Sequence, residues 1–204
     1  MDRTLAGVAL MLGFVATAPL IDVFAKLAAQ TVPEGQVTAA RFLVQGAAML
    51  PFARAGGLAL PRSLVGPLLL RALFVVLSTF SFVSALAAMP MADALAIVFV
   101  MPFILLLLGR LLMGDQVGPR RIAACAVGFG GSLLVIRPAL DAYGWAALWP
   151  LATAATFALY MLITRHLAPR MAPVPMQVHT SALAFLICLP VLVLAEGSGV
   201  GALD

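Results

Sequence analysis

Charged residues are scarce in this chain, making up 10% of its 204 residues, against roughly 25% in a typical soluble domain. Apolar residues account for 64% of the chain, and its mean hydropathy is +1.13. A water-soluble fold cannot hide that much apolar surface, because polar groups have to cover its exterior. The composition excludes a soluble enzyme or signalling domain. It predicts an integral membrane protein whose main surroundings are the lipid bilayer.

Lysine and cysteine are nearly absent. The sequence has one lysine, Lys26, and two cysteines, Cys125 and Cys188, which both lie in apolar runs. Two separate cysteines at membrane depth are expected to be packing residues, and neither a disulfide nor a metal site is predicted. A retinal protein is excluded, because the last predicted helix has no lysine for a Schiff base. The 12 basic residues do not cluster, so we expect no nucleic-acid partner, and no cofactor is predicted.

Seven apolar stretches are separated by turn-forming residues such as Met89-Pro90. A membrane span needs about 20 apolar residues, and lipid offers no partners for an exposed backbone, so each stretch is expected to be a helix. The sequence therefore predicts an all-α, polytopic helical bundle. The predicted helices cover residues 5–27, 36–52, 65–88, 92–113, 121–136, 144–164 and 176–194.

The distribution of basic residues predicts the orientation, because cytoplasmic loops collect lysine and arginine. With the N-terminus in the cytoplasm, the outer ends hold Lys26, Arg41 and Arg137, and the inner ends hold nine of the 12 basic residues. These nine are Arg3, Arg54, Arg62, Arg71, Arg110, Arg120, Arg121, Arg165 and Arg170. The sequence thus predicts seven spans with a cytoplasmic N-terminus.

An internal repeat divides the chain. Residues 20–28 resemble residues 159–167, and Lys26 aligns with Arg165. Five predicted helices separate the two copies, and an odd number means that the second copy is inserted upside down. Inverted repeats of this kind are typical of secondary transporters. We therefore expect a five-helix unit over residues 1–140 and the first two helices of an inverted second unit over residues 141–204.

A more specific pattern runs through the middle of the chain. It comprises residues 85–97, Met101-Pro102-Phe103, residues 112–118, residues 128–131 and Val135-Ile136-Arg137-Pro138. The pattern resembles the EamA-type half of the drug/metabolite transporter superfamily, and the resemblance extends over nearly the whole chain. It implies ten helices in two inverted five-helix repeats. It also implies a permease that moves a small metabolite across a bacterial-type inner membrane by alternating access.

Two features depart from the family pattern. Asp115 stands where the family commonly has glutamate. The chain also ends after the seventh predicted helix, so we expect a truncated second repeat. Without the remaining helices of the second repeat, polar helix faces would be exposed to lipid. We therefore expect that the 204 residues do not transport alone or that they form a homodimer. The Asp22–Lys26 pair resembles a subset of the family that includes riboflavin and S-adenosylmethionine carriers.

Among the ionisable residues inside predicted spans, Asp22, Lys26 and Arg41 are expected to lie near one another. A charge at the bilayer centre costs about 2.5–3.5 kcal/mol on insertion scales, so each needs a partner or a role. Asp22 and Lys26 are four residues apart with the acid first, which favours pairing along a helix. Two interpretations stay open. The three residues form an outer gate or vestibule for an anionic or zwitterionic substrate, or they form a structural ion pair with a lysine that reaches the interface.

Uncharged polar residues form stripes on the predicted helices over residues 36–52, 65–88 and 144–164. Gln45 shares a helix face with Arg41, Ser78 and Ser81 are three residues apart, and Thr156 and Tyr160 are four apart. Such stripes line a substrate path or allow close helix packing. Packing is favoured for the serines, and a path is favoured for Tyr160, which is too large for close packing. The candidate path or gate residues are Asp22, Lys26, Arg41, Gln45, Ser78, Ser81, Pro102, Thr156 and Tyr160.

Pro102 lies within a predicted span, where a proline frees a backbone carbonyl and permits a kink. Asp93 is expected to cap the helix that starts at residue 92, and Asp115 is expected to pair with Arg110, Arg120 or Arg121. The sequence contains no G-x-S-x-G and no H-E-x-x-H pattern, so no enzyme is predicted. The alternative function is a membrane scaffold or assembly subunit that does not transport.

Overall fold

The computed structural model describes residues 3–54, 60–115 and 118–198, and every structural statement below concerns these residues. They form α-helices and one short 3-10 helix, with no strand among them. The elements are α1 (Arg3–Ala28), α2 (Glu34–Arg54), α3 (Arg62–Ala88), α4 (Met91–Val98), α5 (Met101–Met113), α6 (Pro119–Tyr143), η1 (Gly144–Ala147), α7 (Leu148–Leu167) and α8 (Pro173–Ser198).

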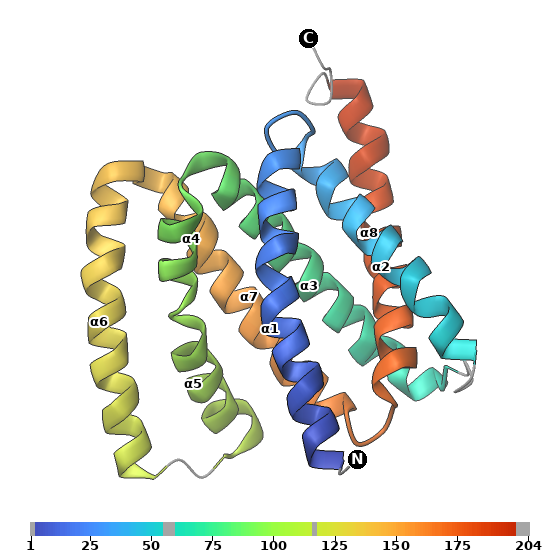
Figure 1. The fold of residues 1–204 in the computed structure, drawn as a ribbon, viewed down its shortest axis with the longest axis horizontal. Coiled ribbons are helices and arrows are strands. Elements are labelled where there is room, and N and C mark those ends of the chain that lie inside the picture. The colour runs from blue at the N-terminus through green and yellow to red at the C-terminus, as the bar shows by residue number, and fades with distance from the viewer. Residues whose placement is uncertain (1–2, 55–59, 116–117, 199–204) are drawn as a thin grey trace.

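The helices run up and down the molecule in alternation, so the two ends of the chain lie at opposite ends of the bundle (Figure 1). The predicted all-α class is confirmed. Five stretches of the described residues are long and apolar enough to cross a membrane, namely Gly7–Ala28, Arg62–Ala88, Met91–Met113, Asp141–Leu167 and Pro173–Pro190. α2 and α6 lie at predicted spans but are not among these five, so the count of seven spans stays a prediction.

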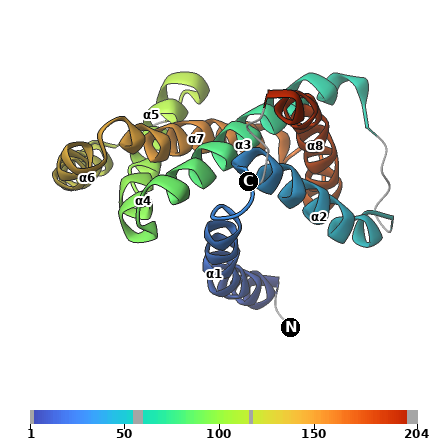
Figure 2. The ribbon, with the colours of Figure 1, turned by 90° about the horizontal axis from the view of Figure 1, so that it is seen from above.

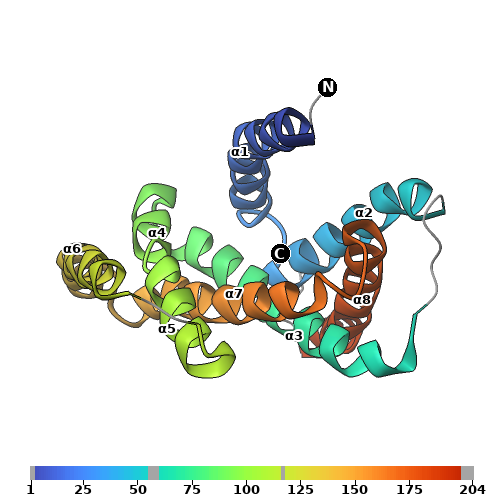
Figure 3. The ribbon, with the colours of Figure 1, turned by 90° about the horizontal axis from the view of Figure 1, so that it is seen from below.

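α3 lies at the centre of the packing, in contact with α2, α7 and α8, and α2 packs along α8. Seen from above, most helices form a long row, and α1 stands apart from it (Figures 2 and 3). α1 touches α3 mainly near its own C-terminal end, where Ala25 joins a core cluster with Phe82 and Leu86. The rest of α1 exposes apolar side chains, which lipid tails accommodate at little cost.

The span predicted over residues 92–113 corresponds to the membrane-length stretch Met91–Met113, but the structure interrupts this helix at Phe99 and Val100, between α4 and α5. The physical reason is Pro102. Proline has no N–H to donate, and its ring clashes with the carbonyl four residues earlier, which here belongs to Val98, the last residue of α4. Pro102 instead occupies the first turn of α5, where a missing N–H costs nothing.

α5 and α6 meet at a glycine. A Cβ added to Gly128 would lie 2.7 Å from Cε1 of Phe103, so this close approach requires glycine. α5 and α6 therefore make a close helix contact at Gly128. α5 itself ends at Gly114, which has a φ of +68°, the left-handed conformation that commonly ends helices.

Candidate functional site

Arg71 is the most deeply enclosed charge among the described residues, with 3% of its surface exposed. It is nine residues beyond the start of α3 at Arg62, which places it about 14 Å along the helix at ~1.5 Å per residue. Arg71 was counted with the inner ends, and the structure encloses its side chain within the bundle. The apolar run does not stop at the arginine, so the helix carries its guanidinium into the bundle.

Every hydrogen-bond acceptor around Arg71 is neutral. Nε donates to Oγ1 of Thr164 at 2.8 Å, and Nη2 donates to Oη of Tyr160 at 2.7 Å. Nη1 donates to Oγ1 of Thr180, and Nη2 also donates to Oε1 of Gln177 at 3.2 Å. These five residues, which we call the Arg71 cluster, join α3 to α7 and α8. No carboxylate balances the charge within the cluster.

Thr164 and Thr180 each donate a hydrogen bond within their own helix, which leaves their hydroxyl oxygens free to accept from Arg71. The hydroxyl of Thr164 donates to the carbonyl of Tyr160 at 2.7 Å, and that of Thr180 donates to the carbonyl of Met176 at 2.8 Å. A hydroxyl has one hydrogen, so this back-bonding within the helix leaves the oxygen lone pairs to accept from Arg71. Beside Thr180, Oγ of Ser181 and Nε2 of His179 are buried without a hydrogen-bond partner.

Arg41 on α2 approaches the cluster from another side. It is half-buried, and its charge interacts with Asp22 on α1 and with Tyr160. Arg71 lies against the ring of Tyr160, and Arg41, from a different helix, interacts electrostatically with the same tyrosine. Together with Asp22, the two arginines give this region a formal charge of +1. The Arg71 cluster, Arg41 and Asp22 come from five helices, and this positively charged region is called the arginine site below.

Lys26 does not join Asp22. Its Nζ donates to the carbonyls of Leu86 at 3.2 Å and Met89 at 2.9 Å, and no ion pair joins Lys26 to Asp22 in the part of the chain that the structure describes. The carbonyls in the last turn of a helix have no partner within that helix and carry partial negative charge, so they compete successfully for the lysine. Lys26 also lines a cavity of about 390 Å³ beside the end of α3.

The remaining predicted residues divide into packing and peripheral positions. Ser78 and Ser81 are buried, and Ser78 donates to the carbonyl of Thr153 at 3.3 Å, in agreement with close packing. Thr156 donates within its own helix to the carbonyl of Ala152 at 2.6 Å. Gln45 is half-buried on α2, and Pro102 is exposed. The structure therefore brings together Asp22, Arg41 and Tyr160 from the predicted set.

Two other predicted acids have partners that the sequence did not indicate. Asp115 receives two bonds from Arg165, at 2.5 Å and 2.9 Å, across 50 positions of sequence. Asp93 lies in the first turn of α4, as expected, and accepts a hydrogen bond from Tyr143 at 2.5 Å. Both acids thus tie helices together.

The sequence interpretation missed Arg71, Gln177 and Thr180 as a connected set. The available signal was an arginine in the middle of a 27-residue helix that is otherwise nearly all apolar, which a membrane helix tolerates only with a partner or a cavity. Among the described residues, no group of three or more histidine, cysteine, aspartate or glutamate side chains could hold a metal ion.

Membrane-length helices that enclose a charged, hydrogen-bonded site define a polytopic membrane protein with a polar interior. The sequence profile of the EamA-like transporter family matches residues 5–137. The chain belongs to this family, and the resemblance found in the sequence is confirmed. Family membership also agrees with the absence of a predicted catalytic role.

Two curated bacterial relatives share substantial identity with the chain. A riboflavin transporter of Rhizobium johnstonii is 40% identical over 119 residues, which cover 58% of this chain and 39% of the relative. A riboflavin transporter of Brucella anthropi is 33% identical over 86 residues, which cover 42% of this chain and 30% of the relative. The chain therefore matches less than half the length of either relative. A solved crystal structure shares the fold with a TM-score of 0.54 at 25% identity, over 86% of this chain and 67% of that one.

Proposed function

We propose that the protein is a secondary transporter for riboflavin or a closely similar heterocyclic metabolite, and that it acts in a bacterial cytoplasmic membrane. The observation that carries the proposal is the arginine site, in which the buried Arg71 donates to Tyr160 and lies against its ring inside the bundle. Membership of the EamA-like transporter family and relatives that are named riboflavin transporters support it.

The chemistry of the site suits a flat ring that carries carbonyl and ring-nitrogen acceptors. A guanidinium offers planar N–H donors, and Arg71 already directs them at neutral acceptors from α7 and α8. A substrate carbonyl can replace one of these acceptors without leaving a buried charge bare. The rings of Phe157 and Tyr160, whose centroids are 5.2 Å apart, add an aromatic surface against which a flat ring can pack.

Alternating access would use the division of the chain into residues 1–140 and 141–204. Arg41 and Arg71 come from the first unit, whereas Tyr160, Gln177 and Thr180 come from the second. A site at the boundary between two inverted units is the arrangement that lets one unit rock against the other around a fixed substrate. In this proposal the hydrogen bonds of Arg71 are remade when the two units move.

The proposed orientation keeps the N-terminus in the cytoplasm. With Arg71 removed from the count, eight of the 12 basic residues remain at the proposed inner ends, and three remain at the outer ends. The excess at the inner ends still favours this orientation. The homodimer expected from the sequence stays a prediction.

Two measurements test the function. Purified chain in nanodiscs should quench flavin fluorescence in a saturable manner, and vesicles that contain the chain as the homodimer expected from the sequence should accumulate radiolabelled riboflavin above empty vesicles. An Arg71→Gln variant should lose both activities, whereas Arg120→Gln on α6, which removes an exposed arginine elsewhere, should retain them. Binding without flux would favour the alternative of a non-transporting membrane subunit. A folded chain that neither binds nor moves riboflavin would contradict the proposed substrate.

A further inference from the structure

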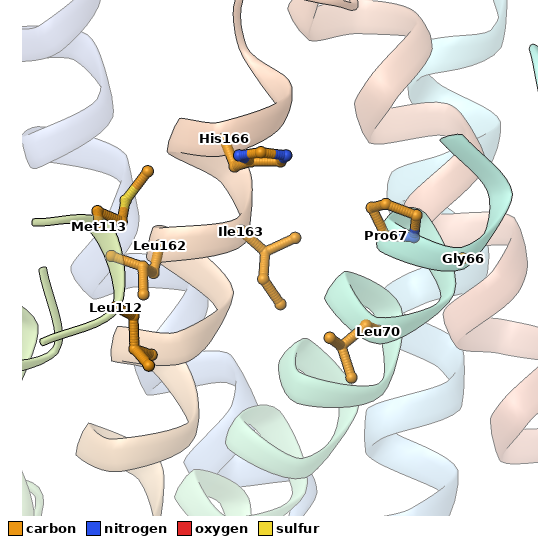
Figure 4. A pocket seen from close by; sticks show the side chains of 8 residues that line it. All are labelled: Gly66, Pro67, Leu70, Leu112, Met113, Leu162, Ile163 and His166. Carbon is orange, nitrogen blue, oxygen red and sulfur yellow. The ribbon is translucent and has the colours of Figure 1, made fainter. Parts of the chain in front are cut away.

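A groove of about 340 Å³ lies between α3, α5 and α7, on the side of α7 away from the Arg71 cluster. Its lining is apolar apart from His166 at one end (Figure 4). Ile163 projects into the space, and Leu70 and Leu112 lie toward the other end (Figure 4). Leu70 is 46% exposed and Leu112 is 64% exposed, so the groove opens sideways toward the hydrocarbon of the bilayer.

At Gly66 the groove reaches the backbone of α3, because glycine has no side chain. A Cβ at this position would meet nothing within 4 Å, so the space beside the helix is empty of protein side chains there. An unbranched apolar chain can lie along such a surface, because only hydrogen atoms project from the backbone at glycine. The opening toward lipid and the apolar lining both suit a fatty acyl chain.

The end of the groove near His166 carries positive charge. Arg62 precedes Gly66 by four residues and continues its face of α3 by one turn, while Arg170 lies in the turn that follows α7, four positions after His166. Both arginines are exposed. The nearest described acid on the packed elements, Asp115, is engaged by Arg165. The charge at this end therefore suits an anionic group at the membrane surface.

We propose that this groove is a binding site for an anionic phospholipid, with one acyl chain between α3, α5 and α7 and the phosphate beside Arg62 and Arg170. Basic pockets between membrane helices are suited to anionic headgroups, and both parts of the lipid have a complementary surface here. The site is separate from the arginine site, so this inference does not depend on the proposed substrate.

Quenching of tryptophan fluorescence by brominated lipids tests the site directly. In a Trp145→Phe, Trp149→Phe background, a Leu70→Trp reporter lies in the groove, and a Leu20→Trp reporter lies on the exposed face of α1. The purified chain is placed in phosphatidylcholine vesicles, and either brominated phosphatidylglycerol or brominated phosphatidylcholine is added. We expect the relative affinity for phosphatidylglycerol to be at least threefold higher at the groove and close to one on α1. Equal ratios at the two reporters would overturn the proposal.

Two pairs of variants separate the headgroup from the chain. Arg62→Gln combined with Arg170→Gln should bring the ratio at the groove reporter close to one, while Arg120→Gln should leave it unchanged. Gly66→Leu should weaken quenching by both lipids at the groove, and Gly130→Leu on α6, where a Cβ also meets nothing, should not. An unchanged signal at the α1 reporter shows that each variant is folded in the membrane. A phosphatidylglycerol preference that survives the double arginine variant would refute the headgroup assignment.

Discussion

Arg71 uses Tyr160 twice. Its Nη2 donates to the phenol oxygen at 2.7 Å, and its guanidinium carbon lies 4.5 Å from the centroid of the same ring. The hydroxyl accepts a hydrogen bond while the ring face attracts the cation. One side chain of α7 thus satisfies a charge on α3 in two ways.

Replacing the hydroxyl should show how much each part of this link contributes. Tyr160→Phe keeps the ring and removes one acceptor, so we expect the free energy of unfolding to fall by about 0.6–1.7 kcal/mol, the usual range for a hydrogen bond within a membrane. We also expect riboflavin to bind roughly tenfold more weakly, about 1.4 kcal/mol, because the arginine must reorient. Unfolding in mixed micelles and flavin quenching measure the two effects. Tyr143→Phe, which removes the hydroxyl bonded to Asp93, serves as the control and should not change binding.

Arg41 tests whether the site extends to α2. Arg41→Gln removes a charge that interacts with both Asp22 and Tyr160, so riboflavin uptake should fall at least tenfold while the amount of folded protein in the membrane stays nearly constant. Uptake and protein level are measured on the same vesicles, with Arg120→Gln as a matched control. Normal uptake in Arg41→Gln would make the residue a structural partner only.

The contact between α5 and α6 makes a prediction that is independent of function. Gly128→Ala places a Cβ against the ring of Phe103 and should destabilise the fold by about 1–3 kcal/mol, as overpacking does. Gly130→Ala, two residues further on, meets no neighbour and should be neutral or stabilising by about 0.5–1 kcal/mol, because alanine favours a helix over glycine. Thermal unfolding in detergent compares the two. The reverse order of stabilities would mean that α5 and α6 do not pack in this way.

Lys26 is expected to hold α1 against the end of α3. Lys26→Met removes the donor for the carbonyls of Leu86 and Met89 and should cost about 0.3–1 kcal/mol, as for a cation at a helix C-terminus. Amide hydrogen exchange in the last turn of α3 should then become about fivefold faster at the upper end of that range. Lys26→Arg keeps a donor and should show a smaller change. Identical exchange in all three proteins would remove the lysine from this role.

Thiol labelling checks the orientation. After Cys125 and Cys188 are replaced, single cysteines at Glu34 and Asp141 should react with an impermeant reagent in whole cells, and one at Arg62 should not. These positions alternate between the two ends of the bundle (Figure 1). Labelling at Arg62 together with protection at Glu34 would reverse the proposed topology.

Much of the fold could be predicted from apolar runs alone. The first helix, for example, was expected over residues 5–27 and is observed over Arg3–Ala28, because lipid leaves the backbone little alternative to a helix. Tyr160 was expected to line a path because it is too large for a close-packing position, and that role stays a prediction, although the structure does place its hydroxyl against Arg71. Pro102 led us to expect a kink but not an interruption of the helix, because many membrane helices accommodate a proline with only a kink.

Pairings between distant residues could not be predicted in the same way. The spacing of Asp22 and Lys26 favours a bond along α1, and yet the lysine bonds to the carbonyls of α3, more than 60 positions away. Arg71 was expected inside the helix over residues 65–88 and was counted with the inner ends, because the positive-inside rule counts charges and does not specify which face of a helix contacts α7 and α8. Such choices depend on the crossing of helices, which a single sequence does not specify.

One membrane-length stretch is divided into two shorter helices, α4 and α5, which can move separately. α4 packs against α6 and α7, while α5 packs chiefly against α7. The helix is interrupted at Phe99 and Val100, so a tilt of α4 need not be carried into α5. In the proposed alternating-access mechanism, this break would let the bundle widen at one surface while the opposite surface stays closed. A continuous helix at this position would move as one rigid body, so that opening at one surface would be coupled to opening at the other.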